Sequence, residues 1–287
     1  MYKRQARGKF LLKILNVYKF FQEYASSDGF DPRPGGTPRP APKDREPLDR
    51  WVLSYLNTTT GKVRGALDAY EFNQAATALE EFVDGVSNWY VRRSRDRAWS
   101  AVEGRSQAPG GTPGDTSKWA FWWTLYEVQT TLTRLIAPFV PFIADDLHRA
   151  LERDVLGAQA HAAAKGPPAA SVHLERYPEV DANLQDPALE ARFALARRVV
   201  TLGQNARTAA KVNVRRPLKQ AVVLLSQPKD EDDVRALADV IADELNVKEV
   251  VVSREHDRYV CFDVRVNFKT LGARLRNRLN PVKQALS

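Results

Sequence analysis

The 287-residue sequence contains one cysteine, Cys261, and one methionine, Met1. A single cysteine cannot form an internal disulfide or a multi-cysteine zinc site. The four histidines are isolated from one another along the chain: His148, His161, His173 and His256. Each is more typical of a surface or loop residue than of a metal ligand, and no glycine-rich phosphate loop followed by lysine occurs. These residue types therefore indicate no catalytic chemistry.

Long hydrophobic runs are also missing. No apolar stretch approaches the roughly 20 residues that a membrane-spanning helix needs. The N-terminal region is basic, but Arg7 and Lys19 interrupt its apolar pattern, so it is not typical of a secretory signal. Hydrophobic residues make up 44% and charged residues 27%, which indicates a globular chain and not a disordered one. We therefore expect a cytoplasmic protein with no membrane partner.

Acidic residues are absent from two stretches of the chain. Residues 191–229 hold nine basic residues and residues 264–287 hold six, with no aspartate or glutamate in either. The formal net charge is +8, so the rest of the chain is net negative. Positive charge segregated in this way favours a polyanionic partner, nucleic acid above all. The alternative is a solvated basic surface without a ligand.

All six tryptophans fall in the first half of the chain, where apolar residues recur at helical spacing. The spacing predicts one helix over 6–25, a second from Pro47 and a long third one that includes Tyr70 and Tyr90. Thr116 or Ser117 would cap a fourth helix, and prolines would end it and start a fifth at position 141. This pattern is typical of a helical bundle.

The second half of the chain is built on valine, leucine and alanine. We expect a helix over 187–210 and another over 231–244. Strands are predicted at 220–225, 249–253 and 259–266, with Asp257 in the turn before the last of them and a final helix from Phe268. The expected organisation is a bundle over 1–156, a linker over 157–186, and a junction helix with a smaller domain over 187–287. The fold class is mainly α, with a bundle followed by a smaller α+β domain.

One segment combines aromatic and basic residues, from Ser87 to Trp99. Aromatic rings beside guanidinium groups can stack on unpaired bases and hold phosphates. The alternative is that the two aromatics continue the buried stripe and the arginines are solvated or ion-paired. The candidate RNA-binding residues here are Trp89, Tyr90, Arg92, Arg93, Arg95 and Arg97.

Two further basic clusters lie in the second half. Residues 211–218 end a helix and lead into a strand, and their lysine and arginines could clamp a phosphate backbone. The alternative is a domain hinge that its charge keeps solvated. Residues 267–274 would begin a helix whose amides could face an anion. The candidates in these clusters are Lys211, Arg215, Arg216, Lys269 and Arg274.

These motifs together resemble the C-terminal portion of isoleucyl-tRNA synthetases of the subtype shared by eukaryotic cytosol and many bacteria. The resemblance covers nearly the whole chain. It rests on segments that occur in the family's order: Phe10-Leu11-Leu12, Asn16-Val17-Tyr18, Asp28-Gly29-Phe30, Leu48-Asp49-Arg50-Trp51, Ser87-Asn88-Trp89-Tyr90-Val91-Arg92-Arg93, Ala137-Pro138-Phe139-Val140-Pro141-Phe142, Ser171-Val172-His173-Leu174, Arg215-Arg216-Pro217-Leu218, Glu244-Leu245-Asn246-Val247-Lys248 and Asn267-Phe268-Lys269-Thr270-Leu271-Gly272.

The resemblance implies an anticodon-binding bundle, an isoleucine-accepting tRNA as partner, and a catalytic half upstream that uses ATP and magnesium. The family's His-Ile-Gly-His and Lys-Met-Ser-Lys-Ser signatures cannot be present, because no two histidines lie three apart and the only methionine is Met1. We therefore expect no catalytic residue, cofactor or metal in this chain and no charging activity of the chain by itself. The editing domain is expected to be missing as well.

Residues 1–5 have a separate interpretation. Tyr2 to Gln5 is what the end of a transposon adaptor used in sequencing libraries would encode, so we expect a scar there and a truncated gene. The alternatives to the leading interpretation are a free-standing RNA-binding helical module, the equivalent region of a valyl or leucyl relative, and a helical scaffold for protein partners.

Overall fold

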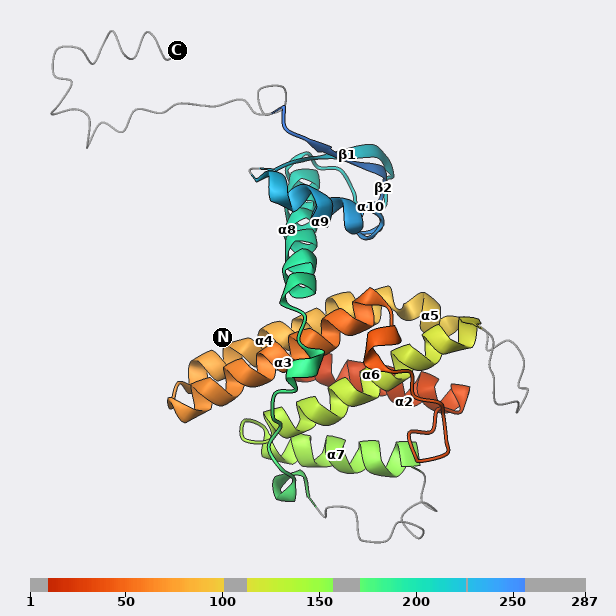
Figure 1. Cartoon of the computed structure of the whole chain (residues 1–287), viewed down its shortest axis with the longest axis vertical. Coiled ribbons are helices and arrows are strands. Elements are labelled where there is room, and N and C mark those ends of the chain that lie inside the picture. Colours follow the sequence, from red (N-terminus) through yellow and green to blue (C-terminus); the bar gives the residue numbers. More distant parts are fainter. Residues whose placement is uncertain (1–9, 101–112, 157–170, 226, 256–287) are drawn as a thin grey trace, which may run out of the picture. The chain divides into compact units, whose positions relative to one another are not determined.

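The computed structural model describes residues 10–100, 113–156, 171–225 and 227–255 (Figure 1). The chain divides into two compact units, residues 1–191 and 192–287. The prediction of a mainly helical protein with a small sheet toward the C-terminus is confirmed.

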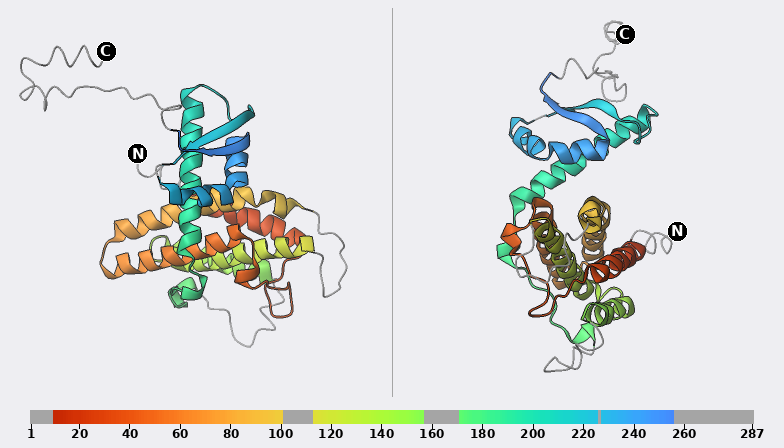
Figure 2. Two further views of the ribbon diagram at one scale, coloured as in Figure 1. Left: turned by 45° about the horizontal axis from the view of Figure 1, so that its top comes forward. Right: turned by 90° about the vertical axis from the view of Figure 1, so that its right-hand side faces the viewer.

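The first unit is a bundle of antiparallel and crossing helices, seen nearly end-on in the right-hand view of Figure 2. Short 3-10 turns connect or follow the helices. The elements are α2 (Leu12–Asp28), η2 (Pro42–Asp44), α3 (Pro47–Asp68), α4 (Phe72–Gly85), the π-helical turn η3 (Val86–Val91), α5 (Arg95–Trp99), α6 (Pro113–Ile136), α7 (Pro141–Leu156), η5 (Val172–Leu174) and η6 (Ala182–Leu184).

Sequence signals place most of these helix ends. Helix α2 ends where Gly29 adopts a left-handed φ of 75°, which lets the amide of Phe30 return to the carbonyl of Ala25 at 2.9 Å. Helices α3 and α7 begin with Pro47 and Pro141, as predicted. Helix α6 begins at Pro113, so the predicted cap at position 116 or 117 is wrong. A proline in the first turn supplies that start, because its missing N–H needs no partner there.

The long third helix predicted through Tyr90 is interrupted. Helix α4 ends at Gly85, a π turn follows over 86–91, and a separate short helix α5 carries the last arginines. A π turn inserts one extra residue per turn, so the 3.6-residue period used for the prediction does not extend across it.

Aromatic side chains fill the core at one end of the bundle. Phe21 and Phe30 pack edge-to-face at 5.8 Å between ring centroids, and both rings contact Tyr126 of α6. The fully buried Trp122 donates its indole N–H to Asp28 at 2.9 Å. Lys118, whose side chain is 3% exposed, binds the other oxygen of Asp28 at 2.7 Å. The single carboxylate therefore ties the end of α2 to α6.

Residues 171–186, the latter part of the expected linker, are held on the bundle by specific hydrogen bonds. The amide of Val172 donates to Asp145 at 2.9 Å, and Tyr177 donates its hydroxyl to the carbonyl of Leu135 at 3.1 Å. The amide of Asp181 donates to Asn57 at 2.8 Å. Contacts to α3, α6 and α7 therefore fix the path of this segment.

The second unit contains a two-stranded sheet and three helices within the residues that the structure describes. Helix α8 (Pro187–Ala209) begins in the first unit and continues into the second. It is followed by β1 (Leu218–Leu224), η7 (Pro228–Asp230), α9 (Glu231–Ala236), α10 (Ala238–Leu245) and β2 (Val247–Ser253). Arg192 of α8 bonds Asp233 of α9 at 2.8 Å, and Gly203 lies against Leu245 of α10 with no room for a Cβ.

The two strands pair in parallel, with Leu218 opposite Val247 and Leu224 opposite Ser253. Parallel neighbours need a crossover of a dozen or more residues, which α9 and α10 provide. The sequence predicts the two strands and the helical region between them but not their parallel pairing. The strand predicted at 259–266 and the helix predicted from Phe268 lie outside the described residues.

Candidate nucleic-acid interface

The π turn carries three consecutive buried residues, Trp89, Tyr90 and Val91, exposed by 8%, 0% and 5%. Trp89 and Tyr90 are therefore part of the bundle core in this structure, which was the alternative to base stacking. Neither ring presents a face to solvent on which a base could stack.

Tyr90 belongs to a buried polar network centred on Asp49 of α3. Its hydroxyl donates to one oxygen of Asp49 at 2.6 Å, and Asp49 is completely buried. Arg97 binds both oxygens of the same carboxylate, at 2.7 and 3.0 Å, and also pairs with Glu46 at 2.9 Å. The arginine therefore joins α5 to the first turn of α3 and is not available to a phosphate.

This network shifts the proton affinity of its members. Burial first, and then the negative charge of Asp49, hold the pKa of Tyr90 well above its ordinary value. Burial acts to lower the pKa of Arg97, but hydrogen bonds and charge from Asp49 outweigh it and raise that pKa. Tyr90 therefore stays a neutral donor and Arg97 a permanent cation, which is the arrangement that satisfies a buried carboxylate.

The remaining arginines of the segment are more accessible. Arg92 and Arg95 are exposed and Arg93 is half-buried. Arg92 donates to the carbonyl of Asn88 at 2.8 Å, which folds its stem along the helix. Trp99, at the end of α5, is 55% exposed and contacts Tyr24 with 6.4 Å between centroids. It is the aromatic residue of this segment with an open face, and sequence reasoning did not single it out because its apolar neighbours are few.

The second cluster, which we call the 211–216 loop, lies in the other unit between α8 and β1. Lys211, Arg215 and Arg216 are all exposed there. Asn213 accepts a hydrogen bond from the amide of Arg215 at 2.9 Å, and its carbonyl accepts one from Arg216 at 3.0 Å. Such turns fix the backbone from which the cations project. Lys269 and Arg274 of the third cluster lie outside the described residues.

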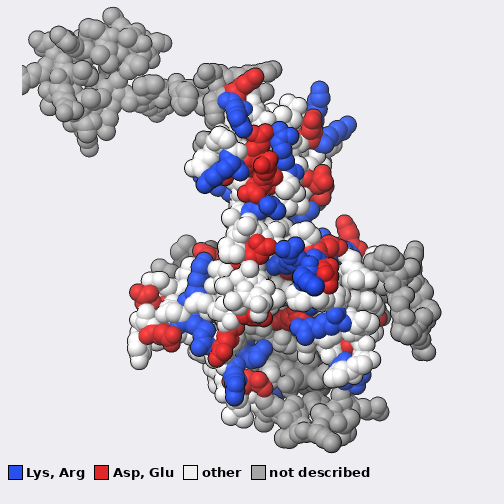
Figure 3. All heavy atoms as spheres, in the orientation of Figure 1, with Lys and Arg blue, Asp and Glu red and all other residues white. Residues whose placement is uncertain are grey.

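Within the described residues, the acid-free stretch 191–229 does not lie on an acid-free surface. In Figure 3, basic and acidic side chains are interspersed over the described surface in that view. In the second unit the helix α9 brings Glu231 and Asp233 beside basic residues, and Asp233 pairs with Arg192. Tertiary packing thus neutralises part of the charge that the sequence segregates, and leaves the 211–216 loop as a local basic feature.

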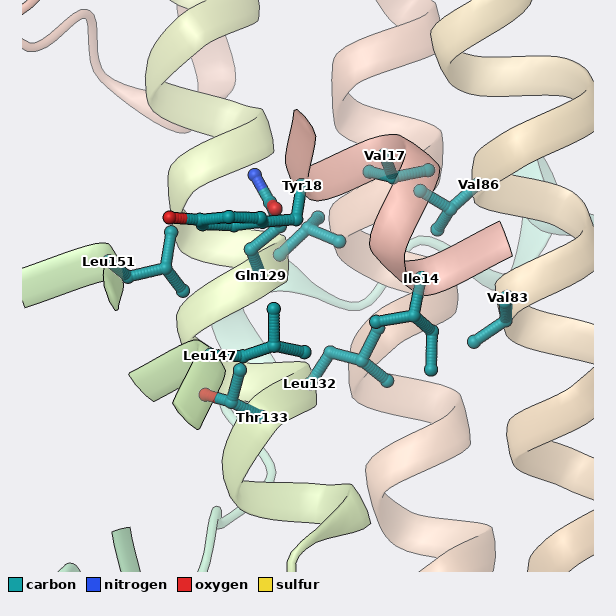
Figure 4. A pocket seen from close by; sticks show the side chains of 11 residues that line it. Ile14, Val17, Tyr18, Val83, Val86, Gln129, Leu132, Thr133, Leu147 and Leu151 are labelled. Atoms are coloured by element: carbon teal, nitrogen blue, oxygen red, sulfur yellow. The ribbon is translucent and has the colours of Figure 1, made fainter. Parts of the chain in front are cut away.

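A small apolar cavity lies inside the bundle and is lined by helices α2, α4, α6 and α7 and by the π turn (Figure 4). Ile14 and Tyr18 form one wall, and Gln129, Leu132 and Leu147 form others. Its volume of about 20 Å³ is enough for one water molecule at most, so it cannot hold a substrate. Within the described ranges no group of three metal-ligating side chains occurs. No helix in them is long and apolar enough to cross a membrane.

The family described as "Anticodon-binding domain of tRNA ligase" matches residues 49–223. The chain therefore belongs to this family.

Relatives along the whole chain are isoleucine–tRNA ligases. Isoleucine–tRNA ligase 2 of Bacillus cereus is 37% identical over 97% of this chain. The isoleucine–tRNA ligases of Chlamydia caviae and Clostridium novyi are 35% and 34% identical over 96% and 99% of it. The chain spans only 24–25% of the length of these relatives. It corresponds to the region of an isoleucine–tRNA ligase that contains the anticodon-binding domain.

Proposed function

We propose that this chain is the tRNA-binding region of an isoleucine–tRNA ligase and binds the anticodon stem-loop of an isoleucine-accepting tRNA. The observation that carries the proposal is the family membership of residues 49–223, which contain the exposed arginines that follow the π turn. ATP-dependent charging, with its magnesium, would belong to the catalytic half of such an enzyme. A cytoplasmic location follows from this role.

In the first unit, the proposed contacts are Arg92, Arg93 and Arg95, with Trp99 as the stacking surface. Arginines on a fixed scaffold can hold phosphates, while an exposed indole can stack on an unpaired base. The Asp49 network supports this role indirectly, because it anchors α5 to α3 and so fixes where Arg95 and Trp99 project. Tyr90 and Arg97 are left out of the proposed contacts because they bind Asp49, and Trp89 is left out because its ring is buried.

The test is filter binding of an isoleucine tRNA transcript by the 287-residue chain at about 50 and 200 mM salt. Removing a phosphate contact should weaken binding and reduce the steepness of the salt dependence. We expect Arg95→Gln to lower affinity about three- to tenfold with a reduced salt slope. Arg176→Gln removes one charge from an exposed position on residues 171–186 and serves as the matched control. Equal affinity of the two variants would reject the proposed surface.

The second candidate, a scaffold for protein partners, has one observation in its favour. Tyr70 and Phe72, at the turn between α3 and α4, are 80% and 56% exposed and contact each other at 6.2 Å. An exposed aromatic pair can mark a protein contact. Absence of RNA binding in the experiment above would favour this second function, and steeply salt-sensitive binding would argue against it.

A further inference from the structure

Arg207, near the end of α8, is a buried arginine whose hydrogen bonds to the described residues all go to backbone carbonyls. The residue is 5% exposed. One terminal nitrogen donates to the carbonyls of Asn213 and Arg216, at 3.1 and 3.0 Å. The other donates to the carbonyls of Leu245 and Asn246, at 2.6 and 3.1 Å. The guanidinium therefore connects the 211–216 loop to the end of α10.

The carbonyls of Leu245 and Asn246 belong to the C-terminal end of α10, where partial negative charge accumulates. This charge compensates the buried cation without an acidic side chain. A guanidinium presents five donors in a planar fork, whereas a lysine ammonium is a compact point charge that cannot span four acceptors on two segments. The geometry at position 207 is thus specific to arginine.

Further hydrogen bonds join the 211–216 loop to Asn246 and to the end of α8. The side chain of Asn246 donates to the carbonyl of Val214 at 2.9 Å. Lys211 has a left-handed φ of 55°, and the next amide, that of Val212, returns to the carbonyl of Arg207 at 2.9 Å. The backbone of the loop is therefore fixed from inside the second unit, while its lysine and arginines project outward.

We propose that the 211–216 loop is a preformed binding site for RNA phosphates and that Arg207 is its positioning residue. This inference rests on the proposed function and adds a second contact region to it. Lys211, Arg215 and Arg216 carry three positive charges within six residues, in a stretch of sequence without acids. Phosphate contacts depend on the spacing of such cations, and a loop that is fixed before binding loses less entropy when it binds.

The test compares two substitutions on α8 that both keep the charge. Arg207→Lys replaces the planar guanidinium with an ammonium group, and Arg198→Lys changes an exposed arginine of the same helix. With an isoleucine tRNA transcript as the probe, we expect Arg207→Lys to lower affinity about tenfold and to reduce the salt slope, although the net charge is unchanged. Arg198→Lys should bind like the unaltered chain.

A double-mutant cycle separates positioning from general stability. If Arg207 acts by placing Arg216, the losses from Arg207→Lys and Arg216→Gln should not multiply in the double variant. Circular dichroism checks the fold of each variant. If Arg207→Lys does not fold, Asn246→Gly replaces it, because glycine accepts the φ of 49° at this position and only the bond to Val214 is lost. We expect Asn246→Gly to lower affinity several-fold, and its loss should not multiply with that of Arg216→Gln in the double variant.

Each outcome decides between the two proposals. Normal binding by Arg207→Lys, or by Asn246→Gly where the first variant does not fold, overturns the positioning role while tRNA binding by the chain stands. Losses that multiply fully with Arg216→Gln overturn it as well. Absence of RNA binding by the unaltered chain overturns both the inference and the proposed function.

Discussion

At the scale of single residues, Asp49 shows how chemistry-bearing side chains are used for structure. It accepts three hydrogen bonds, one from Tyr90 and two from Arg97, in a fully buried position. The sequence pattern favours burial of Tyr90, but it cannot identify the partner, which lies 41 residues away. The role of Arg97 escapes prediction for the same reason, because four arginines in six residues look alike until tertiary contacts distinguish them.

Loss of the Asp49 carboxylate should be strongly destabilising. Asp49→Ala leaves a largely buried guanidinium and a buried phenol without their acceptor, so we expect the free energy of unfolding to fall by about 3–5 kcal/mol. Urea unfolding followed by circular dichroism measures this change. Asp44→Ala, at an exposed aspartate of η2, should change it by less than about 0.5 kcal/mol. Similar values for both variants would refute the structural role of Asp49.

At the scale of elements, the π turn is the feature that sequence reasoning misses. Apolar spacing predicts helices where α2, α3, α7 and α8 lie. The first of these is expected over 6–25 and is observed over Leu12–Asp28, and residues 6–9 lie outside the described residues. Between 86 and 91 the backbone forms a π turn, and the 3.6-residue helical period does not extend across it. Similarly, the residue types predict β1 and β2, but their parallel order depends on the crossover packing of α9 and α10.

The short helix α5 should bind RNA through Trp99. Trp99→Ala removes a stacking surface that is typically worth about 1–3 kcal/mol per base, so we expect about a tenfold loss of tRNA affinity. Trp99→Phe keeps an aromatic face and should retain most of the affinity. Both substitutions remove the indole, which contacts Tyr24. Thermal unfolding of the two variants therefore checks whether a loss of affinity reflects a loss of stability. A Trp99→Phe variant as weak as Trp99→Ala would contradict stacking.

At the scale of the whole molecule, the stability of the bundle should fall at alkaline pH. Burial raises the pKa of Tyr177 to about 12, and burial with the charge of Asp49 raises the pKa of Tyr90 well above its ordinary value. An unfolded tyrosine has a pKa of about 10. The stabilisation from these neutral hydroxyls is therefore complete below about pH 10 and is lost as the pH rises through the folded pKa.

Urea unfolding at about pH 9 and about pH 11.5, on either side of the unfolded tyrosine pKa, tests this dependence. Tyr177→Phe should be less stable than the unaltered chain at the lower pH, because the bond to Leu135 is lost, but it should lose less stability between the two pH values. Equal losses for Tyr177→Phe and the unaltered chain would show that Tyr177 does not contribute.

The distribution of charge is predicted by the sequence only in part. Acid-free stretches indicate a polyanion partner, but α9 places Asp233 against Arg192, which no linear count can foresee. What persists in the described residues is local: the exposed arginines near the π turn in the first unit and the 211–216 loop in the second. The clustering of basic residues in the sequence is enough to predict both of these features. It does not predict that Arg207 holds the loop, because a sequence does not distinguish a buried arginine from an exposed one.

We propose that this chain recognises an isoleucine-accepting tRNA through its anticodon. The most direct measurement is the dissociation constant of the chain for an isoleucine tRNA transcript and for the same transcript with its anticodon replaced, at one fixed salt concentration. We expect weaker binding of the transcript with the replaced anticodon, by about tenfold or more, since lost base contacts cost about 1–3 kcal/mol each. Equal dissociation constants for the two transcripts would contradict it.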